Sequence, residues 1–159
     1  MDEMNGIKVL DKKEKAEIES QLKEQFGISK ILGKIFMRGE ERLFLFSGDF
    51  DESKIKSLEK VAFIERIGIY FAKKEKDCKE IRLSIDGVQA LQNEITKNIF
   101  EIPDEMVEQW MSGRELNIKT GMKGFIVIKN KNDFLGCGKA SEEKIGNFIP
   151  KNRRLKEKS

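Results

Sequence analysis

The residues that could take part in chemistry gather near the C-terminal end, where Gly136-Cys137-Gly138-Lys139 invites comparison with nucleotide-binding loops. A Walker loop needs a glycine five residues before its Gly-Lys pair and a serine or threonine after it. Asp133 and Ala140 stand at those positions. A Rossmann loop needs a third glycine where this chain has Ser141. Neither loop is therefore predicted.

The two glycines instead indicate a strand with one bare face. Gly136 and Gly138 are two residues apart, and such residues point to the same side of a strand. A bare face permits the close approach of another backbone, either protein or phosphodiester, and a tight bend at a barrel corner is the alternative. Cys137 points the other way, and the chain has no histidine to activate it. We expect Cys137 to be buried and structural rather than nucleophilic.

A second group of residues follows, in Asn147-Phe-Ile-Pro-Lys-Asn-Arg-Arg154. Pro150 restricts its own φ and favours extended backbone before it, which predicts a stiff arm that presents the following cations. Arginine guanidinium groups suit bidentate phosphate contacts, lysine adds a point charge, and asparagines can read base edges or ribose. The alternative is a solubilising tail. The predicted RNA-binding residues are Gly136, Gly138, Lys139, Asn147, Pro150, Lys151, Asn152, Arg153 and Arg154.

The charge distribution supports a polyanionic partner. The 159-residue chain has a net charge of +3, but residues 121–159 hold ten lysines and arginines against four acidic residues, or +6, which leaves −3 for residues 1–120. Such a basic block is the usual footprint of phosphate binding, although a solvated lysine-rich surface looks the same by charge alone.

The absence of histidine excludes serine and cysteine nucleophiles activated by histidine and the common zinc ligand sets. Cys78 and Cys137 are too few for a disulfide framework, which favours a reducing compartment. No secretory signal or apolar run of membrane-spanning length is present. We expect a cytoplasmic protein with no metal, no cofactor and no membrane partner.

Hydrophobic spacing predicts an α+β protein. The first expected helix spans 10–26 and ends at Gly27, and the second follows a cap at Asp51 or Ser53. The third follows a cap at Asp86, and the fourth spans 103–111 with Trp110 in the core. Strands are expected at 28–37, 41–46, 67–71, 81–85, 98–102, 124–129, 133–139 and 147–149. The charged segment 72–79 predicts a boundary between an N-terminal α/β domain (1–76) and a second domain (77–159), although a long hairpin turn would look similar.

The C-terminal pattern resembles a known family. Leu-Gly-Cys-Gly-Lys139, then Asn-Phe-Ile-Pro-Lys-Asn-Arg-Arg154, preceded by the helix at 103–111 and Gly113-x-x-Leu116, is similar to the PUA-like RNA-binding domain at the C-terminus of the Nop/Sun (RsmF-type) RNA cytosine-5 methyltransferases. The resemblance implies a mixed β-barrel with flanking helices that binds RNA. The chain lacks the glycine-rich cofactor loop and paired cysteines of the catalytic domain, so the resemblance implies no methyl transfer. The layout also looks like that of small ribosome-biogenesis factors of the Nip type.

The sequence therefore favours a non-catalytic protein that recognises structured rRNA or tRNA in ribosome biogenesis, rRNA processing or RNA modification. Its partners would be RNA and either a modification enzyme or a pre-ribosomal particle. One alternative is a protein-interaction module or an accessory subunit of an RNA-modifying enzyme. Another is an RNA-modifying enzyme with Asp86 as a catalytic carboxylate, although Asp-Gly after a strand is mostly turn chemistry.

Overall fold

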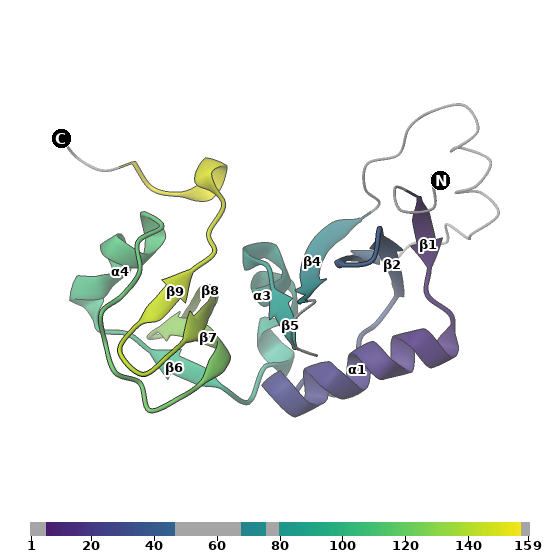
Figure 1. Cartoon of the computed structure of the whole chain (residues 1–159), viewed down its shortest axis with the longest axis horizontal. Helices are drawn as coiled ribbons and strands as arrows, with labels where there is room; N and C mark the ends of the chain where they lie inside the picture. The colour runs from purple at the N-terminus through teal and green to yellow at the C-terminus, as the bar shows by residue number, and fades with distance from the viewer. Residues whose placement is uncertain (1–5, 47–67, 76–79, 157–159) are drawn as a thin grey trace.

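The computed structural model describes residues 6–46, 68–75 and 80–156, and these residues form two sheets with helices packed against them (Figure 1). The first sheet is entirely antiparallel, in the order β1 (Ile7–Val9), β2 (Lys34–Arg38), β3 (Arg42–Phe46), β4 (Ile69–Lys74) and β5 (Ile81–Leu83). The second has the order β6 (Ile99–Glu101), β7 (Gly124–Asn130), β8 (Asp133–Ala140) and β9 (Ile145–Asn147). The predicted α+β class is confirmed.

The first helix, α1 (Lys12–Phe26), follows local signals. Asp11 caps its N-terminus, because its side chain accepts a hydrogen bond from Glu14 N while the Glu14 side chain accepts from Asp11 N. Gly27 ends the helix in the left-handed conformation, as predicted. A Cβ there would also lie 1.9 Å from Thr96 Oγ1, so this glycine is required for packing as well.

The β2–β3 hairpin forms as predicted, but β2 begins at Lys34 rather than residue 28. Ile28 and Ile31 are fully buried without belonging to a strand, so their hydrophobicity reports core packing rather than strand pairing. The helix predicted after Asp51 or Ser53 lies outside the described residues, as does Ile67.

Strands β4 and β5 are paired antiparallel. The boundary predicted at 76/77 thus falls between two paired strands, and the first sheet extends to Leu83. The predicted strand 81–85 ends earlier, because Ser84 caps α3 (Ile85–Leu91): its Oγ accepts from Gly87 N at 2.9 Å. The expected cap, Asp86, lies in the first turn instead.

The second sheet is mixed, because β6 is parallel to β7 while the other pairs are antiparallel. Pro103 precedes α4 (Asp104–Met111), and Trp110 on this helix is fully buried, as predicted. The last strand spans Ile145–Asn147, slightly before the expected 147–149. Pro150 then leads into a short 3-10 turn, η3 (Lys151–Arg153).

A continuous hydrophobic core joins the two sheets. The same cluster contains Phe26 of α1, Phe71 of β4 and Val88 of α3 together with Phe125 of β7 and Cys137 of β8. Gly87 allows α3 to lie directly on β4, because a Cβ there would sit 2.0 Å from the carbonyl oxygen of Phe71. In Figure 1, α3 and the edge strand β5 lie where the first sheet meets the second. The shared hydrophobic core therefore fixes the positions of the residues at this junction.

Candidate nucleic-acid interface

The glycines of β8 face protein rather than solvent. Gly136 and Gly138 are both buried. A Cβ on Gly138 would lie 2.7 Å from the backbone oxygen of Gly146 and 2.7 Å from the Trp110 ring. The Trp110 indole is held there by donating from Nε1 to Leu135 O at 2.9 Å. The bare face is thus covered by α4 and β9, so of the two kinds of backbone that it was expected to admit, the one that lies against it here is protein, at Gly146.

Cys137 is buried in the hydrophobic core, as predicted from its position on the strand. Burial raises the pKa of its thiol to about 12, because a thiolate cannot be solvated there. The thiol is therefore a structural group rather than a nucleophile.

The side chain of Asn147 makes hydrogen bonds within the protein. Its Nδ2 donates to Trp110 O at 2.8 Å and to Arg114 O at 3.0 Å, and its Oδ1 accepts from Ile149 N at 2.8 Å. These bonds tie the end of β9 to the end of α4. Because both ends of the amide are engaged, the expectation that Asn147 contacts base edges or ribose is not supported by its geometry.

The segment after Pro150 folds back on the protein instead of extending as an arm. Leu155 N donates to Met111 O at 2.8 Å, and Arg154 Nε donates to Ile149 O at 2.8 Å. The Arg154 side chain also lies over Gly113, where a Cβ would come within 2.3 Å of Nε. The expected stiff arm is thus a turn pinned against α4, and its orientation is set by these contacts.

Arg153 faces α3 from this turn. Its Nη1 donates to both carboxylate oxygens of Asp86, at 3.0 and 2.9 Å. Both side chains remain about half exposed, at 43% and 46%. The pair therefore connects η3 to the N-terminal end of α3 at the junction between the two sheets. Asp86, considered above as a catalytic carboxylate, is engaged in this ion pair.

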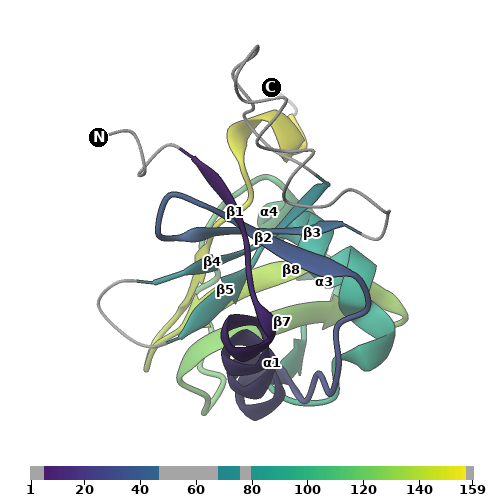
Figure 2. The ribbon, with the colours of Figure 1, turned by 90° about the vertical axis from the view of Figure 1, so that its right-hand side faces the viewer.

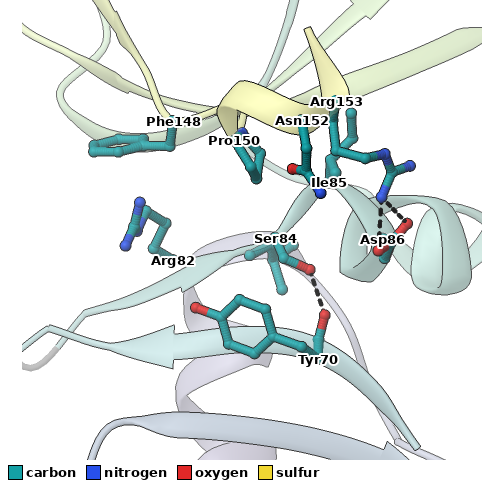
Figure 3. Close-up of a pocket in the computed structure, with 10 residues that line it drawn as sticks. Tyr70, Arg82, Ser84, Ile85, Asp86, Phe148, Pro150, Asn152 and Arg153 are labelled. Carbon is teal, nitrogen blue, oxygen red and sulfur yellow. Dashed lines mark hydrogen bonds and ion pairs between the residues drawn. The ribbon is translucent and has the colours of Figure 1, made fainter.

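A groove of about 210 Å³ lies at this junction, and we call it the junction groove (Figure 3). Its walls come from β4, β5 and the start of α3 on one side and from the segment after β9 on the other. The lining residues are Tyr70, Arg82, Leu83, Ser84, Ile85, Asp86, Phe148, Pro150, Asn152 and Arg153.

The most distinctive contact in the groove is between a cation and an aromatic ring. The Arg82 guanidinium carbon lies 4.2 Å from the centroid of Phe148, a large hydrophobic side chain that is 38% exposed. The Phe148 ring is 6.0 Å from that of Phe125, and Lys139 Nζ is 5.4 Å from the Phe125 centroid. The four side chains thus form a row in the order Arg82, Phe148, Phe125 and Lys139. A cation lies next to an aromatic ring at each end of this row, and Lys139 is exposed on β8.

Tyr70 forms part of the opposite wall. Burial raises the pKa of its phenol above the ordinary value, so the hydroxyl stays protonated at neutral pH and can donate or accept a hydrogen bond. Tyr70, Arg82 and Phe148 were missed by sequence reasoning. No local motif marks them, because the groove forms only where strands β4 and β5 lie close to the segment after β9, more than sixty residues later in the chain.

The mixed sheet, α4 and the cationic turn η3 together form one small α+β unit. Residues 97–155, from β6 through η3, match the family model described as the methyltransferase RsmF PUA domain. This part of the chain is a PUA-like domain of the Nop/Sun type, as the resemblance predicted, and the domain supports RNA as a partner. The match does not extend to the first sheet. No curated protein matches the chain.

Within the described residues, α1 is the longest helix, and none is long and apolar enough to cross a membrane.

Proposed function

We propose that the protein binds structured rRNA or tRNA without catalysing a reaction on it, and that it acts in ribosome biogenesis or RNA modification. The observation that carries this proposal is the match of residues 97–155 to a PUA domain of an RNA methyltransferase, over the segment that holds η3 and its cations. A modification enzyme acting in trans would supply the chemistry, or a pre-ribosomal particle would supply the RNA.

The positions of the exposed cations support the proposal. Lys139 lies on β8, and Lys151, Arg153 and Arg154 lie on or next to η3, all of them exposed. Figures 1 and 2 both place η3 on the opposite side of the molecule from α1. A phosphate backbone attracted to η3 would therefore reach the mouth of the junction groove and not the lysines of α1.

The test uses a transfer RNA transcript and the variant Lys139→Gln with Lys151→Gln. If both lysines contact phosphate, the slope of log affinity against log salt should become shallower by about 1.5, because each contact contributes roughly 0.7 to 0.9. The matched control is Lys12→Gln with Lys13→Gln, which removes the same charge from exposed positions on α1. An unchanged slope in the first variant, or an equal change in both, would overturn the assignment.

The non-catalytic part of the proposal has its own test. The pure protein is incubated with the transcript, the RNA is digested to nucleosides, and their masses are compared with those of untreated RNA. Unchanged masses are expected. A new nucleoside whose formation is abolished by Asp86→Asn would contradict the proposal and favour the carboxylate-based enzyme.

A further inference from the structure

We propose that the junction groove receives one unpaired nucleobase, so that the protein recognises RNA with a bulged or looped-out nucleotide. This rests on the proposed RNA binding and adds a specific element to it. The groove combines stacking surfaces, hydrogen-bonding groups and a position beside the cationic turn η3.

The stacking surface is already in place. Unpaired bases in RNA are commonly recognised by stacking on aromatic rings or arginine guanidinium planes. The Arg82 guanidinium lies over the Phe148 ring at 4.2 Å, and the tilted Phe125 ring lies 6.0 Å from that of Phe148, so a base stacks either on the outer side of this pair or on the Phe148 ring in place of the guanidinium. Because these side chains hold one another, little conformational freedom remains to be lost when a base stacks on them.

The size of the groove selects for a single base. Its volume of about 210 Å³ lies below the range of roughly 300–1,000 Å³ that is typical of drug-sized ligand sites. A double helix cannot enter such a space, and extruding a paired base costs more than inserting one that is already unpaired. A bulged or loop nucleotide is therefore the RNA element that fits.

Polar groups are available to hydrogen-bond the edge of the base. Figure 3 shows the Asn152 side chain directed from η3 toward the space above Ser84 and Tyr70. The Asn152 amide and the Tyr70 hydroxyl each have a donor and an acceptor. The Ser84 hydroxyl is already engaged, because it donates to Tyr70 O at 2.7 Å and accepts from Gly87 N. Asn152 and Tyr70 are thus assigned to base recognition.

The charges beside the groove suit the phosphates that flank such a nucleotide. Lys151 is exposed on the same turn as Asn152, and Arg153 borders the groove while paired with Asp86. Arg82 is balanced by Glu75, whose Oε2 lies 3.3 Å from Arg82 Nε. The groove interior is therefore close to neutral, as a neutral base requires, and the free positive charge lies at its rim.

The experiment compares two hairpin RNAs that differ only by a single bulged nucleotide, with the full chain as the binding protein. The parent protein should bind the bulged RNA more tightly. Phe148→Ala should weaken binding to the bulged RNA by about ten- to a hundredfold, because stacking on one aromatic ring contributes that much, and should leave binding to the fully paired RNA unchanged. Phe148→Trp preserves an aromatic face and should retain most of the affinity.

Asn152→Ala provides a second variant at an exposed position, should Phe148→Ala fail to fold, and should reduce discrimination among the four bulged bases. A fluorescent 2-aminopurine at the bulge should become brighter when the parent protein draws it out of the RNA stack, and should change little with Phe148→Ala. Equal losses for both RNAs, or no loss for either, would overturn the groove assignment while leaving RNA binding intact. Failure of the parent to bind either RNA would overturn the proposed function and, with it, this inference.

Discussion

Replacing Asn147 with alanine separates a structural role from an RNA-reading role. The substitution removes three hydrogen bonds, two to the carbonyl oxygens of Trp110 and Arg114 and one from Ile149 N. A typical hydrogen bond contributes about 0.5–1.5 kcal/mol, so the free energy of unfolding should fall by roughly 2–4 kcal/mol. For a chain of this size, that corresponds to a decrease in Tm of about 5–12 °C.

Urea and thermal denaturation followed by circular dichroism would measure this loss. Asn147→Asp is the matched control, since it keeps the shape and the acceptor for Ile149 N but turns the donating end into an oxygen that faces two carbonyl oxygens. It should be at least as destabilising as alanine at neutral pH. If Asn147→Ala unfolds within about 0.5 kcal/mol of the parent yet loses RNA affinity tenfold, the structural role is refuted and the base-reading interpretation restored.

Gly87→Ala should lower the free energy of unfolding by about 1–3 kcal/mol, because the clash with Phe71 O outweighs the gain of about 1 kcal/mol in helix propensity. Asp86→Asn should change stability by less than about 1 kcal/mol but raise RNA affinity about two- to fivefold, because it releases Arg153 to bind phosphate. Cys137 should react with a thiol reagent at pH 8 only after unfolding, because with a pKa of about 12 roughly one thiol in ten thousand is ionised.

Each of these predictions has a control that the chain provides. Gly146→Ala should be nearly neutral, because a Cβ there would meet its nearest atom at 3.7 Å. Lys129→Gln with Asp86 intact tests whether RNA affinity responds to charge in general rather than to the release of Arg153. Thiol reactivity is measured in a Cys78→Ser background, so that one thiol is followed. Fast labelling of the folded protein, or a drop in affinity for Asp86→Asn, would contradict the corresponding prediction.

The elements that the sequence predicted well are those specified by neighbours along the chain. The capping signals and four-residue spacing around α1, the glycine at its end and the polar turn between β7 and β8 act within a few residues. The burial of Trp110 and Cys137 followed from the same kind of pattern. The resemblance of the C-terminal third to a PUA domain rested on such local motifs and was confirmed by the family model.

The sequence by itself thus determined the α+β class, most helix and strand positions and the basic character of the C-terminal segment. Only the tertiary structure decided what the individual residues do. Gly138 and Asn147 became packing and bridging residues because Trp110 lies against them, and Arg153 turned toward Asp86 because η3 folds back. The junction groove was decided in the same way, since Tyr70 and Arg82 meet Phe148 only when the shared core brings two distant segments together, and no signal along the chain encodes that contact.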